Sequence, residues 1–438
     1  MKSLRTAAAF GALLAAAPAI AQHGDHGAHG AHQAESQDHG GHQGHAPPAG
    51  APAAEPHAMT GALGPYPARR EASGTAWQPD VSSHNGVHLT AGDWMLMGHA
   101  SLNLVYDWQE GPRGGDKLFA AGMVMGMARR EAGPGTLQVR AMLSPDPLMG
   151  RRGYPLHLAA GESADGIAPL VDRQHPHDVF MELSASYALP LGPKASAFVY
   201  AGLPGEPAFG PPAFMHRMAI ADSPEAPISH HWLDSTHITF GVVTAGLILG
   251  DVKLEASRFN GREPDQRRWN IETGPLDSTA LRLSWNPNSE LSLQASWAHL
   301  VSPEQLEPHE NSRRWSASAL WTRRLGPESW VSTTLAWGNR DGAEALVAEA
   351  GLGLGLWTLY GRAEYAQNNE LDPAAGHHGP RHDVGKVSLG AIRDVRVAPH
   401  VRLGLGAQLT QNFVPAALEA AYAGDPRGAM AFIRLKID

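Results

Sequence analysis

Histidines recur at close spacing near the start of this sequence, in a stretch that contains few other large side chains. Eight histidines occur between residues 23 and 57, mostly three residues apart and separated by Gly, Ala, Gln and Asp. Neutral imidazole nitrogens are common ligands of Cu, Zn and Ni, so many of them together can collect metal ions weakly. The candidate metal ligands of this run are His23, His26, His29, His32, His39, His42 and His45.

A second group of ligand-type side chains lies in two long polar segments. The first ends in DRQHPHD at residues 172–178, and the second contains FMHR at residues 214–217 and SHHWLDSTH at residues 229–237. If the segments meet, they offer nitrogen and oxygen ligands for a transition metal. These candidates are His175, His177, Asp178, Met215, His216, His230, His231, Asp234 and His237. Alternatively, the polar residues pair with arginines that pin the loops inside a barrel, namely Arg151, Arg152, Arg173 and Arg217.

Methionines form a third group, because ten of the 13 lie between Met95 and Met218. In strands whose large apolar residues face outward, the alternating positions point these thioethers inward. Thioethers are soft ligands that favour Cu(I). The candidates with this orientation are Met95, Met97, His99, Met123, Met125 and Met127. The alternative interpretation is that methionine fills irregular space against a folded-in loop.

Nucleophilic catalysis is not predicted. Ser235 lies near His237 and Ser296 near His299, but neither pair has a third partner or an oxyanion-binding device in the sequence. We therefore expect no enzyme. The chain has no cysteine, which excludes disulfides and thiolate metal sites.

The elements that must position these residues are β-strands. In residues 280–297, ALRLSWNPNSELSLQASW, two runs alternate apolar and polar residues on either side of a turn, which predicts a hairpin with one apolar face. Similar runs recur without helical segments to cover them. The predicted strands are 94–107, 117–130, 136–144, 178–189, 195–203, 236–248, 252–259, 279–285, 291–299, 314–323, 330–337, 344–353, 357–366, 384–395, 401–411 and 429–437.

The connections between these strands alternate between short turns and long loops. The long ones are predicted at 108–116, 145–177, 204–235, 260–278, 300–313, 338–343, 367–383 and 412–428. An even strand number with this alternation is typical of an outer-membrane barrel. We therefore predict an all-β fold: a transmembrane antiparallel up-and-down β-barrel of about 16 strands (14–16), with both termini in the periplasm.

The start of the chain predicts export. Residues 1–21 have a basic start, an apolar core and a small-residue ending, which is typical of a secretory signal peptide. We expect a disordered His/Pro/Ala-rich tether in the periplasm at residues 22–76 and an outer-membrane β-barrel at residues 77–438. The formal net charge of −9 argues against a nucleic-acid partner, and the expected partners are outer-membrane lipid and metal ions.

The layout resembles outer-membrane copper-resistance proteins of the copper-resistance protein B type. The resemblance rests on the leader QHGDHGAHGAHQ and the Met/His-bearing first strands, followed by a barrel. It implies sequestration of copper at the outer membrane or movement across it. The sequence departs from that family because the only leader methionine after residue 21 is Met59, so Zn, Ni and Co are as plausible as copper.

Two functions therefore stay open. The first is an outer-membrane barrel that binds, sequesters or passes transition-metal ions in metal resistance or homeostasis, with no tightly bound cofactor and a periplasmic metal-carrier protein as a candidate partner. Protonation near pH 6 is expected to release the metal. The alternative is a general or anion-leaning porin with an incidental His-rich tether, whose selectivity depends on Arg129, Arg140, Arg282 and Arg362.

Overall fold

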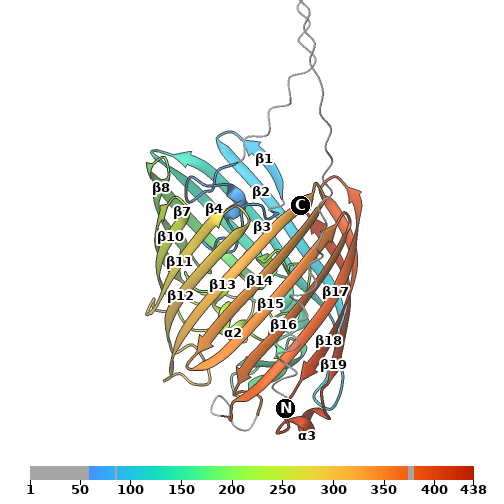
Figure 1. Cartoon of the computed structure of the whole chain (residues 1–438). Helices are drawn as coiled ribbons and strands as arrows, with labels where there is room; N and C mark the ends of the chain where they lie inside the picture. Colours follow the sequence, from blue (N-terminus) through green and yellow to red (C-terminus); the bar gives the residue numbers. More distant parts are fainter. Residues whose placement is uncertain (1–58, 84–85, 373–378) are drawn as a thin grey trace, which may run out of the picture.

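The computed structural model describes residues 59–83, 86–372 and 379–438. Seventeen strands form one antiparallel sheet, in which β1 (Val87–Ala91) pairs only with β2, so that 16 strands close the barrel. Closure is made by the pairing of β19 with β2, in which Leu104 is opposite Ile433. Figure 1 shows the tilted strands around one continuous wall.

The barrel strands are close to the predicted ones, and all sixteen are present. They are β2 (Trp94–Gln109), β3 (Gly115–Ala132), β4 (Gly135–Leu143), β7 (Phe180–Gly192), β8 (Ala195–Gly202), β9 (Val242–Leu249), β10 (Val252–Phe259), β11 (Ser278–Asn288), β12 (Leu291–Val301), β13 (Asn311–Gly326), β14 (Ser329–Arg340), β15 (Ala343–Leu354), β16 (Trp357–Asn368), β17 (His382–Ala398), β18 (Val401–Phe413) and β19 (Arg427–Ile437).

The wall has an apolar outer face and a polar inner face. In β11, Leu281, Leu283 and Trp285 are exposed on the outside, whereas Arg282 and Ser284 are buried on the inside. Soluble proteins have the reverse arrangement, with apolar side chains inside. An apolar outer face and a polar inner face suit a wall that meets lipid outside and polar groups inside. Within the ranges that the structure covers, no helix has the length and hydrophobicity that crossing a bilayer requires.

The two ends of the barrel differ, as predicted. Two-residue turns join β3 to β4 and β9 to β10 at one end, whereas the connections at the other end are mostly long. Two predictions were wrong in detail. The connection of β14 to β15 is short, at residues 341–342, because Asp341 and Gly342 adopt positive φ angles in a tight turn. Strand β9 starts at Val242 rather than at residue 236, because residues 235–237 form a 3-10 turn.

The described residues that precede the barrel differ from the prediction of a tether. Residues 59–83 pack into the short-turn end of the lumen and include the short helix η1 (Ala68–Arg70). Tyr66 and Trp77 are buried, and Arg70 lies over both rings at 5.4 and 4.9 Å while it forms an ion pair with Asp80. These aromatic and ionic contacts order the segment. The signal-peptide prediction and the seven tether histidines lie outside the described residues.

Two loops fill the lumen from the other end. The hairpin loop (residues 144–179) contains η2 (Asp146–Met149) and a two-stranded sheet of β5 (Tyr154–Ser163) and β6 (Pro169–Gln174), which the sequence did not predict. The central loop (residues 203–241) contains η3 (Phe214–His216), α2 (His230–Leu233) and η4 (Ser235–His237). A last short helix, α3 (Glu419–Tyr422), lies at the long-loop end.

Ion pairs attach the central loop to the inner wall. Arg217 is fully buried and contacts Glu349 of β15 at 2.7 Å, and Glu225 contacts Arg362 of β16 at 3.3 Å and Lys386 of β17. Large barrels of this kind leave an interior that needs filling or stays aqueous. Here the loops, held by buried charge pairs, occupy much of it.

Candidate functional site

The hairpin loop and the central loop bring five of the predicted histidines together, a set that we call the histidine group. His175 and His177 follow β6, His230 and His231 lie on α2, and His237 ends η4. Their rings form a connected chain of contacts. The ring centroids are 6.0 Å apart for His175 and His231, 5.6 Å for His230 and His231, and 5.2 Å for both His230–His237 and His177–His237.

The most specific geometry is that of His177 and His237, whose Nε2 atoms lie 3.3 Å apart. His177 directs Nδ1 at a carboxylate oxygen of Asp146 at 2.9 Å, and His237 directs Nδ1 at the main-chain carbonyl of Asp234 at 2.6 Å. Both partners are hydrogen-bond acceptors, so each Nδ1 is placed to donate and the two Nε2 atoms face each other. A proton or a metal ion between the two Nε2 atoms would stabilise this arrangement.

Asp234 organises the central-loop side of the histidine group. Its carboxylate accepts a hydrogen bond from Nδ1 of His230 at 2.8 Å and forms a 2.7 Å ion pair with Arg217. The main-chain amide of Phe214 donates to the same carboxylate at 2.9 Å. Asp234 therefore orients two imidazoles, His230 through its carboxylate and His237 through its main-chain carbonyl.

Electrostatics keep part of the histidine group neutral. Burial lowers the pKa of His237 well below its usual value, and the neighbouring His177 and His230 lower it further. Burial also lowers the pKa of His175 well below its usual value, with help from Arg268. Burial lowers the pKa of His230 as well, although Asp234 opposes this shift. Neutral imidazoles are the form that binds metals.

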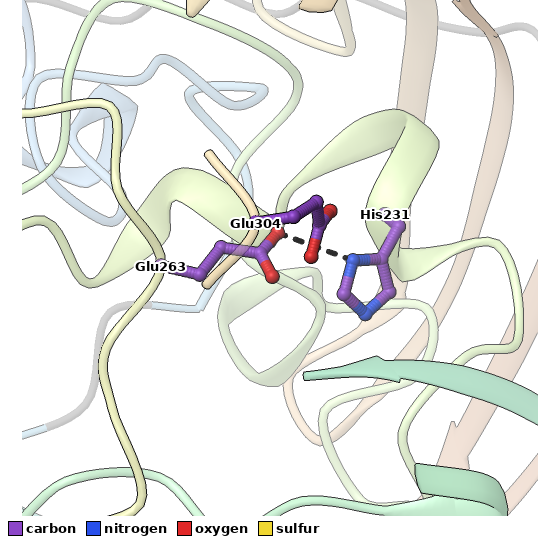
Figure 2. Close-up of side chains that lie close together, drawn as sticks. All are labelled: His231, Glu263 and Glu304. Atoms are coloured by element: carbon purple, nitrogen blue, oxygen red, sulfur yellow. Dashed lines mark ion pairs between the residues drawn. The ribbon is translucent and has the colours of Figure 1, made fainter. Parts of the chain in front are cut away.

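His231 differs from the other members of the group. Burial alone would lower its pKa, but Glu263, whose Oε1 lies 3.3 Å from Nδ1, raises it. Gly161 of β5 makes room for this ring, because a Cβ there would lie 2.7 Å from two of its atoms. Glu304 completes a group of three, since one ligand atom from each residue lies within 4.8 Å of the others. Figure 2 shows the three side chains pointing toward one another. Neither glutamate was predicted as a ligand.

Two predicted residues near the histidine group have other surroundings. Asp178 contacts Arg268 at 3.1 Å, and burial raises its pKa to about 6 despite this arginine. His216 lines a cavity of about 190 Å³ closer to the short-turn end, together with His99.

The predicted inward orientation of the methionines is confirmed. Met97, Met123 and Met125 are buried in one cluster, with Met127 and Met215 packed against it. The same cluster contains Ile238 and Phe240 of the central loop, which is the packing expected if methionine fills irregular space against a folded-in loop. Met95 is half-buried near the start of β2, outside this cluster. A cavity of about 60 Å³ is nevertheless lined by Met123 and Met215 together with His177.

The predicted arginine ladder is largely neutralised by partners. Arg140 contacts Glu182 at 2.7 Å, Arg282 contacts Glu255 at 2.9 Å, and Arg362 contacts Glu364 at 3.1 Å. Arg129 lies near the short-turn end and donates to the carbonyl of Thr60. Of the arginines expected to pin loops, Arg217 does so, and Arg173 donates to the carbonyl of Arg152 within the hairpin loop.

Residues that complete the site came from outside the predicted set. Asp146 orients His177, and Glu162 lies 3.3 Å from Nδ1 of His175. His175 Nε2 is buried and makes no hydrogen bond within the described ranges. The signal for these carboxylates was weak, because Asp146 is 31 residues from His177 in sequence and only the folded loop joins them.

This chain is a porin-like outer-membrane β-barrel, as its closed sixteen-strand wall and apolar outer face define. No family model and no curated protein matches the sequence. Among solved structures, it is similar to Salmonella typhi OmpF in complex with daunomycin (9% identity, 80% of this chain and 100% of that chain, TM-score 0.49). It is also similar to OmpT of Vibrio cholerae (8%, 80% and 100%, TM-score 0.44) and to a mutant of the Rh. blastica porin (14%, 78% and 100%, TM-score 0.39). None of these names a copper-resistance protein.

Proposed function

We propose that this outer-membrane barrel binds a transition-metal ion inside its lumen, in metal resistance or homeostasis, and that His177 and His237 are its central ligands. The observation that carries the proposal is the 3.3 Å separation of their Nε2 atoms, with both Nδ1 atoms held by acceptors. Metal–nitrogen bonds of roughly 2.0–2.1 Å at tetrahedral angles place two ligand nitrogens about 3.3 Å apart. Histidine ligands of metals also generally donate their other ring nitrogen to a carboxylate or carbonyl.

The surroundings of the pair supply further ligands of the same kind. His230 adjoins His237, and Met215 lines the small cavity beside His177. Imidazole ligands suit Cu, Zn, Ni and Co, and a thioether adds preference for Cu(I). Copper therefore stays our first candidate, with Zn, Ni and Co as alternatives. The tether histidines, if they collect metal in the periplasm, would raise its concentration near the barrel.

A second candidate function is passage of small solutes, as in a general porin. It is supported by the sixteen-strand up-and-down architecture, which general porins share. An anion preference gains little support from Arg140, Arg282 and Arg362, because each has a carboxylate partner. This candidate predicts conductance that does not depend on the histidine group.

Calorimetry on the refolded full chain tests the metal proposal. Cu(I), Cu(II), Zn, Ni and Co are titrated at about pH 7.5 into a background variant with the eight histidines of residues 23–57 changed to glutamine, so that only barrel sites report. We expect saturable binding whose stoichiometry falls by one ion in the His177→Ala/His237→Ala variant. The control is His88→Ala, which removes an exposed imidazole from β1. An unchanged stoichiometry after loss of the pair, or no binding at all, refutes the site and leaves the porin function.

A further inference from the structure

A second cluster of ligand-type side chains lies beyond the histidine pair, toward the long-loop end. His231 comes from α2 of the central loop, Glu263 from the loop between β10 and β11, and Glu304 from the loop between β12 and β13. Three separate connections thus converge on one point, as Figure 2 shows. One ligand atom from each lies within 4.8 Å of the other two.

Two of the three converging side chains, His231 and Glu263, are buried. The side chains of His231 and Glu263 are 7% and 8% exposed, and Nδ1 of His231 lies 3.3 Å from Oε1 of Glu263. Neither oxygen of Glu263, nor Nδ1 of His231, makes a hydrogen bond within the described part of the chain. Buried carboxylates are usually satisfied by hydrogen bonds or by a cation. The oxygens of Glu263 therefore point at a place where a cation would stabilise them.

Two arginines, Arg314 and Arg340, lie near the cluster but leave the oxygens of Glu263 without a close hydrogen bond. Arg314 lies 3.8 Å from Glu263, which is the distance of an ion pair without a close hydrogen bond. Arg340 forms ion pairs with Glu304 at 4.0 Å and with Glu370. With the three glutamates ionised, the two arginines leave the empty cluster with a net charge of about −1, which a divalent ion would change to about +1.

A cavity adjoins the cluster at Glu304. It has a volume of about 310 Å³, and its charged lining residues include Glu304, Glu307 and Glu310 together with Arg314, Arg340 and Arg381. Glu304 is thus shared between the cavity and the cluster. Carboxylates that line a confined entrance raise the local concentration of cations.

We propose that His231, Glu263 and Glu304 form a second site, for a divalent cation, that receives the ion from this cavity and delivers it to the histidine pair. The proposal rests on the proposed function in one respect only, the delivery to His177 and His237. The ring of His231 lies 5.6 Å from that of His230, which lies 5.2 Å from that of His237. The ion would therefore move from His231 to His230 and then to His237, each time between neighbouring imidazoles.

The ligand chemistry sets the class of ion. Two carboxylates and one imidazole suit borderline and harder divalent ions such as Zn²⁺, Co²⁺ and Mn²⁺, and they disfavour Cu(I). Ligand distances of roughly 2.0–2.2 Å place ligand atoms about 3.3–3.6 Å apart at tetrahedral angles, so atoms as far as 4.8 Å apart must approach each other by about 1.3 Å. Glutamate side chains on loops can make such a movement.

Cobalt(II) is the probe for the test, because its absorption spectrum reports coordination and its stoichiometry is measurable by elemental analysis. All variants carry glutamine at the eight histidines of residues 23–57 and are refolded as full chains. We expect the background protein to hold two Co²⁺ ions, the Glu263→Gln/Glu304→Gln variant to hold one, and the His177→Ala/His237→Ala variant to hold one. The matched control, Glu131→Gln/Glu344→Gln, removes two exposed carboxylates and should hold two.

Each result decides between the two sites. Two results refute the second site. Either the Glu263→Gln/Glu304→Gln variant keeps both ions, or the background protein binds one ion that only the histidine variant loses. The cluster is then a structural ion-pair network. If the histidine variant keeps both ions, the proposed function fails at that pair while the second site is judged separately by its own variant. Stopped-flow loading tests delivery: the histidine pair should fill about tenfold more slowly in the Glu263→Gln/Glu304→Gln variant, at the low end of electrostatic focusing. An unchanged loading rate refutes the entry role.

Discussion

Replacement of Arg217 by methionine should release the central loop from the barrel wall. Arg217 is fully buried, and its guanidinium makes two hydrogen bonds to Glu349 at 2.7 and 2.8 Å and one to Asp234 at 2.7 Å. Methionine fills the space but leaves two carboxylates buried without their cation. Removal of one partner of a buried ion pair typically costs about 3–5 kcal/mol, which is at least ~100-fold in an opening equilibrium.

Amide hydrogen exchange measures this opening directly. In the Arg217→Met variant, protected amides of residues 203–241 should exchange at least ~100-fold faster, while the barrel strands keep their protection. The control is Arg396→Met, which breaks the pair of Arg396 with Glu328 at the exposed short-turn end and should change little. A second variant, Arg217→Met/Glu349→Gln, should recover part of the protection. If exchange in residues 203–241 is unchanged in Arg217→Met, the buried ion pairs do not hold the loop.

Three further predictions concern the site and the lumen. Asp146→Asn should weaken metal binding in calorimetry by about 10–100-fold through the lost orientation of His177, while Asp116→Asn, an exposed change, leaves it unaltered. The lowered pKa of His237 should make the folded loop less stable as pH falls below about 6.5, because the unfolded loop then binds protons that the folded loop does not. Intrinsic-rate-corrected exchange of residues 203–241 should therefore rise, and metal release should require a lower pH than the expected pH 6. Arg70→Ala should detach residues 59–83 and increase single-channel conductance in planar bilayers, whereas the exposed Arg69→Ala should not.

The barrel was predictable because its signal is local. Alternation in a segment such as Leu281 to Trp285 fixes both the strand and its outer face, and short turns fix the register of neighbours. The ordering of residues 59–83 was not predictable by the same means. It depends on contacts such as Arg70 with Asp251 and Lys253 with the Trp77 ring, which join positions far apart in the chain. The β5–β6 hairpin also lacks alternation, because Leu158, Glu162 and Asp172 have positive φ angles.

The site was predictable in part for the same reason. Histidines in two neighbouring long loops were expected to meet, and His175, His177, His230, His231 and His237 do so. Which ring nitrogen each presents could not be read from spacing. That depends on Asp146 and on the carbonyl of Asp234, whose positions follow only from the folded loops. The same applies to Glu263 and Glu304, which approach His231 from two other loops.

The buried charge pairs of the central loop have a consequence for how this barrel is assembled. Residues 203–241 are synthesised before β15, β16 and β19, yet their charges meet Glu349, Arg362 and Arg434 on those strands. A wall that closed by joining β19 to β2 without the loop would enclose these side chains unpaired, at a desolvation cost of several kcal/mol each. Insertion of the loop and sealing of the wall are therefore one cooperative event, and an empty barrel is disfavoured as a product of biogenesis.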